Sequence, residues 1–172
     1  MVESSSADSR AFTDLFDRYA QAIYRHCFFR LRDAQLAEDI LQETFVRMWE
    51  YLAKGKHADN ERAFLYRIAN NLIVDEVRRI KRRPTVSLDV MVEAGIEPSH
   101  EPMKELQGEM ERQRLFSYLD QVGEPYREIL ILRYVDQCSP REIAVILGRS
   151  APVVSVQLHR AVRKLRSLLP HA

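Results

Sequence analysis

The apolar residues in the first half of the chain recur at the three- and four-residue spacing of amphipathic helices. Residues 10–32 carry one such stripe, which consists of Phe12, Leu15, Phe16, Tyr19, Ile23, Cys27 and Leu31. A second stripe consists of Leu36, Ile40, Leu41, Phe45, Met48, Trp49 and Leu52, and a third of Leu65, Ile68, Ala69, Leu72, Ile73, Val77 and Ile80. Three helices with one apolar face each can bury those faces against one another, so we expect residues 10–83 to form a three-helix domain.

The polar residues between the stripes predict where these helices begin and end. Asp33 and Asn60 have side chains that cap helix N-termini, and we place them at the start of the second and third helices. Pro84 ends the third helix, because proline lacks the backbone N–H that an inner helical turn requires. Residues 54–59 contain a glycine and no apolar stripe, and we interpret them as a loop.

Helical spacing is lost between the two halves of the chain. Residues 84–108 contain Pro84, Pro98 and Pro102 and are interpreted as a linker. Residues 1–9 are polar, so we expect a flexible tail there and not a secretory signal. Helices resume from about Lys104, and residues 109–172 are assigned to a second helical domain.

The second domain contains the pattern of a helix-turn-helix in residues 139–167. Ser139 followed by Pro140 and Glu142 predicts a capping box at a helix start. Gly148 supplies the backbone freedom of a sharp turn. A second helix begins near Ser150, and its buried stripe consists of Val154, Leu158, Ala161 and Leu165.

The charges are distributed in three zones, although the net charge of the 172 residues is only +1. Residues 78–83 contain five basic residues in six, and no acid follows Glu142. Residues 84–112 hold seven acids and two basic residues, a net charge of 2 − 7 = −5. The predicted fold is therefore all-α: two small helical domains, each with a basic zone, joined by an acidic linker.

Both basic zones lie on helix faces suited to nucleic acid. The second helix of the helix-turn-helix presents Val153, Val156, His159, Arg160 and Arg163 opposite its apolar stripe, as a helix in a DNA major groove would. The third helix presents Asn71, Asp75, Arg78 and Arg82 on one polar face, which suits strand-separated DNA. A plain helical hairpin with a solvated basic face is the alternative. Tyr66 could stack on a base, whereas Phe64 and Trp49 are interpreted as core residues.

The sequence contains no pattern of a catalytic or metal site. The five histidines are dispersed, no glycine-rich phosphate loop exists, and no apolar run approaches the roughly 18 residues of a membrane helix. Cys27 and Cys138 match no disulfide or metal spacing, and we expect reduced thiols, with a redox switch as the alternative. We therefore predict no enzyme activity, no cofactor, no metal and no membrane insertion.

Four stretches of the sequence resemble extracytoplasmic-function sigma factors, the small sigma-70 type subunits of bacterial RNA polymerase. Residues 37–49 and 64–79, with AEDILQETF and FLYRIANN, resemble region 2 of that family. Residues 124–134 and 140–161, with EPYREIL, LRY and LHRA, resemble region 4. The likeness covers nearly everything except the tail and the linker.

This resemblance implies a promoter-recognition subunit without its own catalytic site, working in the cytoplasm. Its partners would be core RNA polymerase, through the clamp helices and flap, promoter DNA, and an anti-sigma factor that holds it inactive. The polymerase-binding residues would be Glu38, Asp39, Gln42 and Glu43. The −10 element would contact Lys54, Lys56, Tyr66, Asn70, Asn71, Asp75, Arg78, Arg79 and Arg82, with a flipped-out base held by the loop. The −35 element would contact Arg149, Ser150, Val153, Ser155, Val156, His159, Arg160 and Arg163.

The second helix of the helix-turn-helix departs from that family at three positions. Val153 stands where threonine is usual, Gln157 where arginine is usual, and Ser155 where a basic residue is common. We interpret these changes as a loss of phosphate contacts and a gain of apolar groups for thymine methyls. The −35 contact would be weaker or differently specific, and a partner-binding use of this face stays open.

A free-standing transcriptional regulator is the main alternative. It would use the same helix-turn-helix with an N-terminal dimerisation or sensing domain, and it would bind duplex promoters without polymerase. The cluster of Asp39, Gln42 and Glu43 and the two basic zones favour the sigma factor.

Overall fold

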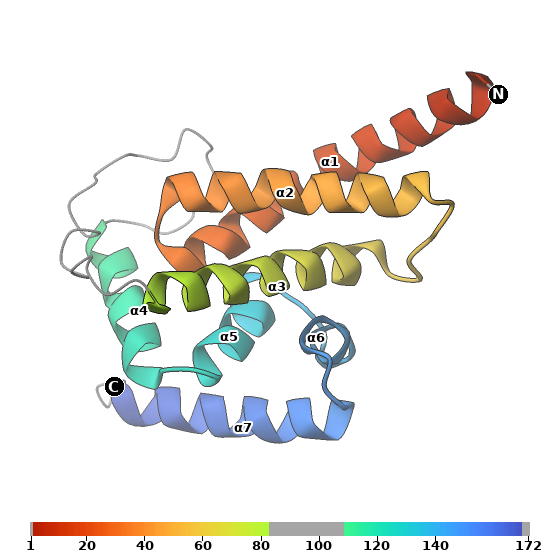
Figure 1. Cartoon of the computed structure of the whole chain (residues 1–172). Helices are drawn as coiled ribbons and strands as arrows, with labels where there is room; N and C mark the ends of the chain where they lie inside the picture. Colours follow the sequence, from red (N-terminus) through yellow and green to blue (C-terminus); the bar gives the residue numbers. More distant parts are fainter. Residues whose placement is uncertain (1, 83–108, 170–172) are drawn as a thin grey trace. The chain divides into compact units, whose positions relative to one another are not determined.

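The computed structural model describes residues 2–82 and 109–169 of the chain. The chain divides into two compact units, Met1–His100 and Glu101–Ala172, here called unit 1 and unit 2 (Figure 1). The described residues form α-helices and one short π-helical turn, and they contain no strand. The prediction of an all-α fold with two helical domains is confirmed. The predicted acidic linker, residues 84–108, lies outside the described residues.

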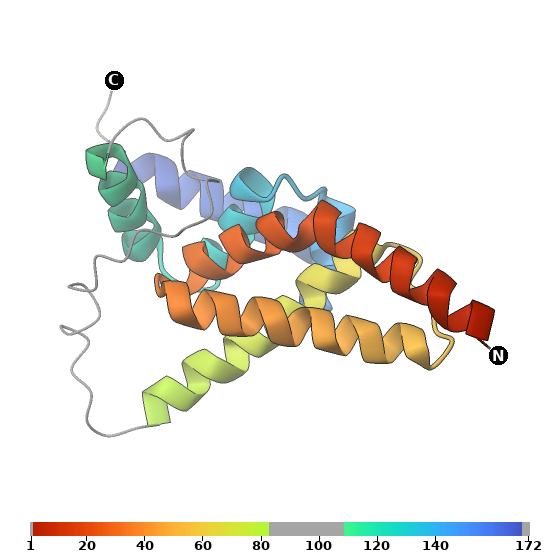
Figure 2. The same cartoon turned by 90° about the horizontal axis from the view of Figure 1, so that it is seen from above.

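Unit 1 consists of three helices that pack against one another. They are α1 (Val2–Leu31), α2 (Ala34–Ala53) and α3 (Glu61–Arg82), seen from above in Figure 2. Their predicted apolar stripes meet in a core in which Ile23, Met48 and Leu65 are fully buried. Three amphipathic helices in mutual contact remove most of this apolar surface from water, which is the main stabilising contribution to such a unit.

The first helix is longer than the sequence pattern predicted. It begins at Val2 and not near residue 10, so the expected flexible tail, residues 1–9, is helical from Val2 onward. The physical reason is that residues 2–9 contain neither glycine nor proline. Extending an existing helix costs far less than nucleating one, so a packed helix continues through such residues.

Aromatic rings form one edge of the unit 1 core. The Phe16 ring lies 4.8 Å from the Phe45 ring, and the Phe12 ring lies 5.1 Å from the Trp49 ring, both edge to face. Trp49, expected in the core, contacts Phe12 but keeps 37% of its surface exposed. Phe64 is half-buried and packs against Tyr51 at 4.5 Å.

The predicted N-caps of α2 and α3 are confirmed. The Asp33 carboxylate accepts a hydrogen bond from the Leu36 amide at 2.9 Å. The Asn60 side-chain oxygen accepts one from the Ala63 amide, also at 2.9 Å. Each cap satisfies a backbone N–H that the first helical turn leaves without an intrahelical acceptor.

Unit 2 is built around its last helix. Its elements are α4 (Glu109–Val122), α5 (Tyr126–Leu130), the π-helical turn η2 (Ile131–Val135), α6 (Pro140–Leu147) and α7 (Ala151–Leu168). Helix α7 contacts α4, α5 and α6 and buries Val154 and Ala161 at those contacts. The core of unit 2 also includes Ile129, Ile143 and Ile146, all 0–2% exposed.

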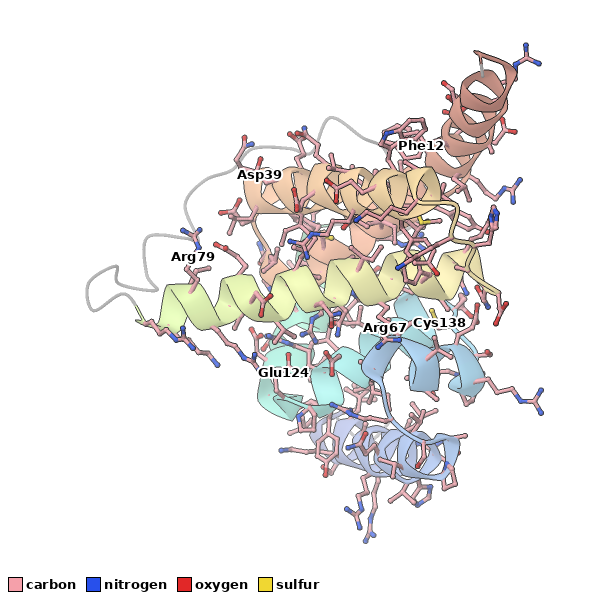
Figure 3. The ribbon with its side chains drawn as sticks, turned by 45° about the vertical axis from the view of Figure 1, so that its right-hand side comes forward. Phe12, Asp39, Arg67, Arg79, Glu124 and Cys138 are labelled. Atoms are coloured by element: carbon pink, nitrogen blue, oxygen red, sulfur yellow. The ribbon has the colours of Figure 1, made fainter. Side chains whose placement is uncertain are left out.

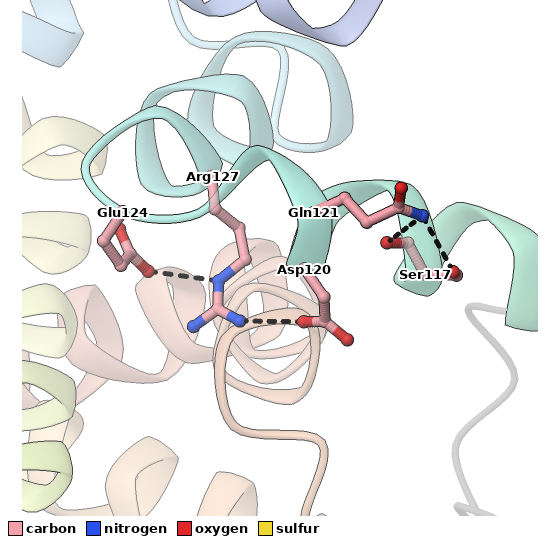
Figure 4. A network of polar contacts seen from close by, with 5 residues as sticks. All are labelled: Ser117, Asp120, Gln121, Glu124 and Arg127. Carbon is pink, nitrogen blue, oxygen red and sulfur yellow. Dashed lines mark hydrogen bonds and ion pairs between the residues drawn. The ribbon is translucent and has the colours of Figure 1, made fainter. Parts of the chain in front are cut away.

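A polar network joins the end of α4 to α5 (Figure 4). The Arg127 guanidinium donates to Asp120 and to Glu124, each at 3.1 Å. Within α4, the Gln121 side chain donates to the hydroxyl and the backbone carbonyl of Ser117, one turn before it, at 3.3 Å. One carboxylate comes from α4 and the other from the turn, so Arg127 on α5 is held to both, which restricts the angle between the helices.

The helix-turn-helix predicted for residues 139–167 is present as α6 and α7. The Ser139 hydroxyl accepts from the Glu142 amide at 3.2 Å, and the Glu142 carboxylate accepts from the Ser139 amide at 2.8 Å. Both bonds of the predicted capping box are therefore formed. Gly148 ends α6 with φ +61, a left-handed conformation that residues with a Cβ adopt only with strain.

Replacing the Ser139 hydroxyl tests this capping box. Ser139→Ala leaves the Glu142 amide without its side-chain acceptor, so we expect unit 2 to lose about 1 kcal/mol of unfolding free energy. Ser167→Ala is the matched control, because its hydroxyl bonds only the Lys164 carbonyl near the exposed end of α7. Urea unfolding followed by circular dichroism measures both. Equal midpoints for the two variants would show that the cap contributes nothing.

Candidate nucleic-acid and partner interfaces

The exposed face of α3 brings together most of the residues predicted for the −10 element. Asn71, Asp75, Arg78 and Arg82 are all exposed. Asp75, Arg78, Arg79 and Arg82 line a shallow hollow at the C-terminal end of the helix. Figure 3 shows Arg79 at this end of α3, and Asp39 on α2. The hollow offers guanidinium donors and carboxylate acceptors side by side, which suits phosphates and base edges.

Two of the residues predicted for the −10 element are buried in the core of unit 1. Tyr66 is 0% exposed and Asn70 is 5% exposed, so neither can contact DNA in this conformation. The Tyr66 ring instead lies 5.2 Å from the His26 ring and 5.3 Å from the Arg62 guanidinium. Positions 66 and 70 are one turn apart on the side of α3 that also carries Ile73, and that side packs into the core.

Arg67 was not among the residues predicted for the −10 element. It is exposed and lies one turn before Asn71, so it extends the polar face of α3 toward the N-terminus (Figure 3). The sequence could have predicted that Arg67 lies on this face, because positions 67, 71, 75 and 78 follow each other at helical spacing.

The arginines of α3 differ in how far their charge is balanced locally. Arg79 donates two hydrogen bonds to Glu76, at 2.6 and 2.8 Å. These bonds and the negative charge of Glu76 raise the pKa of Arg79 above its ordinary value. The nearest oxygen of Asp75 lies 3.9 Å from Arg78. The positive charge of Arg79 is thus more fully neutralised by its own helix than that of Arg78.

The loop between α2 and α3 is anchored by Tyr51, another residue that sequence reasoning missed. Its hydroxyl donates to the backbone carbonyl of His57 at 3.2 Å. The ammonium of Lys56 lies 5.8 Å from the centre of the same ring. Lys54 and Lys56, both predicted for the −10 element, are exposed on this loop. A single aromatic side chain at the end of α2 therefore restrains the loop that carries both lysines.

Helix α2 places three of the four predicted polymerase-binding residues on an exposed edge. Asp39, Gln42 and Glu43 are exposed, whereas Glu38 is half-buried. Burial raises the pKa of the Tyr24 phenol, and the negative charge of Glu38 raises it further. Glu43 accepts from Arg47 at 2.8 Å, which leaves Asp39 as the principal negative charge of this exposed edge.

The predicted DNA-facing side of α7 is exposed. Its members are Ser150, Val153, Ser155, Val156, His159, Arg160 and Arg163. Val153 and Val156 keep 45% and 49% of their surface in contact with solvent. Opposite them, Val154 and Ala161 are fully buried. The arrangement matches a helix held by one face and free to enter a groove with the other.

Arg149 differs from the other residues predicted for the −35 element. It is half-buried, and its guanidinium donates to the Gln157 side-chain oxygen at 2.8 Å. The second terminal nitrogen lies 3.6 Å from the Glu128 carboxylate on α5. Its polar contacts are therefore made within unit 2.

The described residues contain no group of three or more histidine, cysteine or acidic side chains that could hold a metal ion. Cys27 and Cys138 are buried and form no disulfide. No helix in the described ranges is long and apolar enough to cross a membrane.

Two family models match this chain in succession. The model described as Sigma-70 region 2 matches residues 15–83, which correspond to the three helices of unit 1. The model described as Sigma-70, region 4 matches residues 112–165, which correspond to α4–α7. Together they cover more than half of the sequence.

Curated relatives match over almost the full length. The extracytoplasmic-function RNA polymerase sigma factor SigW of Bacillus subtilis is 30% identical, over 94% of this chain and 90% of SigW. SigL of Mycobacterium tuberculosis, named in the same way, is 29% identical over 96% of this chain and 93% of SigL.

Solved structures share the fold. CnrH, in complex with the cytosolic domain of CnrY, superposes with a TM-score of 0.69 at 25% identity, over 97% of this chain and 92% of CnrH. The sigma factor RpoE of Bartonella quintana, solved with the anti-sigma factor NepR, gives a TM-score of 0.71 at 20% identity, over 92% of this chain and 96% of RpoE.

Removing one hydroxyl tests whether Tyr51 anchors the loop between α2 and α3. We expect Tyr51→Phe to increase hydrogen exchange of the amides in residues 54–59 about fivefold, because one net hydrogen bond contributes about 1 kcal/mol. Exchange in the centres of α2 and α3 stays unchanged. Tyr19→Phe, on α1, is the matched control. Unaltered exchange in the loop would show that the Tyr51–His57 bond does not restrain it.

Proposed function

The chain belongs to the extracytoplasmic-function sigma factors of the sigma-70 family, and from this premise we propose how its two units share promoter recognition. Unit 1 binds core RNA polymerase and the melted −10 element, and unit 2 reads the −35 element as duplex DNA. The single observation that carries this division is that each matched region exposes one basic helix face, on α3 and on α7.

The −10 surface is proposed to consist of the exposed face of α3 and the loop before it. Arg78 and Arg82 supply charge for phosphates, while Asn71 and Asp75 supply donors and acceptors for base edges. Arg67 is added to this set. A face that carries both hydrogen-bond donors and acceptors suits separated strands, whose base edges are no longer paired. Lys54 and Lys56 contribute positive charge where a flipped base would leave the duplex.

The −35 surface is proposed to be the exposed side of α7. Val153 and Val156 are positioned near the N-terminus of the helix, where apolar groups can contact thymine methyls in the major groove. Arg160 and Arg163 lie about one to three turns further on, where they can reach phosphates. This division between apolar base contacts and cationic backbone contacts keeps specificity and affinity on separate residues.

The polymerase contact is proposed for the exposed edge of α2 formed by Asp39, Gln42 and Glu43. Carboxylates and an amide on one edge offer a negative, hydrogen-bonding surface to a basic partner. Glu38 is half-buried, and its negative charge acts on Tyr24. The protein acts there without a catalytic site of its own, as a dissociable subunit of a cytoplasmic enzyme.

Control by an anti-sigma factor is part of the proposal. CnrH, which is 25% identical to this chain, was solved in complex with the cytosolic domain of CnrY. A protein that covers the edge of α2 would exclude polymerase and keep the sigma factor inactive. A free-standing regulator would need no polymerase, which separates the two functions experimentally.

Transcription in vitro tests the proposed function. We expect the purified chain to direct start sites on genomic fragments with core polymerase, and to show negligible sequence-specific DNA binding alone. Asp39→Lys with Glu43→Lys reverses the charge of the α2 edge and is expected to abolish polymerase binding. Glu50→Lys, also exposed on α2, is the control. Specific promoter binding without polymerase would favour a free-standing regulator.

A second set of variants tests the −10 surface. We expect Asn71→Ala to reduce open-complex formation about tenfold, because a base contact is worth about 1–3 kcal/mol. Tyr66→Phe and Gln21→Ala leave it unchanged, since Tyr66 is buried and Gln21 lies on α1. Permanganate reactivity of unpaired thymines measures strand separation. A strong defect in Tyr66→Phe with an active Asn71→Ala would place the reading face on the opposite side of α3.

A further inference from the structure

Three side chains from separate parts of unit 2 meet at the N-terminal end of α7. Glu128 comes from α5, Arg149 from the turn between α6 and α7, and Gln157 from the second turn of α7. The Arg149 guanidinium lies between the other two, donating to Gln157 at 2.8 Å with its other nitrogen 3.6 Å from Glu128. The arginine therefore connects α5 to α7 across the sharp turn that Gly148 makes possible.

Burial makes this connection more consequential than a surface ion pair. The Glu128 side chain is only 8% exposed, and that of Arg149 is 30% exposed. A carboxylate so far removed from water needs a nearby cation or hydrogen-bond donors, because an unpaired buried charge is strongly destabilising. Arg160 and Arg163, in contrast, are exposed.

We propose that Arg149 is a positioning residue that fixes the start of α7 against α5 through Glu128 and Gln157, and is not a DNA phosphate contact. The next residues, Ser150 and Val153, begin the surface proposed to read the −35 element. Arg149 thereby sets the angle at which that surface enters the groove. This inference rests on the proposed function of α7, and it also assigns Gln157 a role inside unit 2.

Salt dependence of promoter binding distinguishes a positioning arginine from a phosphate contact. Each phosphate contact contributes about 0.9 to the slope of log affinity against log salt. With holoenzyme reconstituted from the full chain and core polymerase, we expect Arg149→Leu to weaken promoter binding about tenfold without changing the slope. Arg160→Ala, the comparison variant, lowers the slope by about 0.9. A slope reduced equally by Arg149→Leu would overturn the proposal.

Templates without a −35 element separate positioning from a general loss of stability. On a promoter whose −35 sequence is scrambled, Arg149→Leu should bind as well as the unmodified protein, because the surface that it misplaces is no longer used. A defect of equal size on both templates would show that Arg149 only supports folding. If the unmodified holoenzyme binds both templates equally, the −35 function of α7 itself is refuted, which is a different outcome.

Relocating the arginine provides the sharpest test and guards against misfolding of the single variant. Gln157 already reaches the Arg149 guanidinium, so an arginine at position 157 can place its own guanidinium near Glu128. We expect Arg149→Leu combined with Gln157→Arg to regain most of the lost −35-dependent binding. Glu128→Gln should reproduce the defect of Arg149→Leu and add nothing to it in the double variant. Failure of the relocated arginine to rescue, or full additivity with Glu128→Gln, would contradict the proposal.

Discussion

The helical period sets the main constraint on both proposed DNA surfaces, because burying one face of α3 or α7 determines which side chains remain in solvent. In α3 the buried side includes Leu65, Ala69 and Ile73, and this leaves Asn71 and Asp75 exposed. In α7 the burial of Val154 and Ala161 has the same effect on Val153 and the arginines that follow. A rotation of either helix by one residue, about 100°, would remove its reading face.

A second constraint is the pairing of arginines with nearby polar side chains of the protein. It changes how much positive charge an arginine can offer to DNA, and not where the arginine lies. The sequence contains many arginines in its two basic zones, yet they are not equivalent in the folded protein. Arg79 forms two hydrogen bonds with Glu76, and Arg149 lies between Glu128 and Gln157. Arginines such as Arg82 and Arg160 are exposed and can meet a polyanion with less competition. Counting basic residues therefore overstates the charge available to DNA.

The turns between helices position these surfaces through individual side chains. Tyr51 restrains the loop that precedes α3, and Arg149 connects the turn before α7 to the body of unit 2. In both cases the side chain that fixes the turn differs from the side chains proposed to contact DNA.

Much of this protein was determined by its sequence alone: three helices in the first domain, the caps at Asp33 and Asn60, and the helix-turn-helix with its capping box. These features depend on residues close together in the chain, whose preferences are readable as local patterns. Only the tertiary structure decided that Tyr66 and Asn70 are buried, that α1 begins at Val2, and that Arg149 pairs with Glu128. Burial and long-range pairing depend on which surfaces meet in space, and no local pattern specifies the partner.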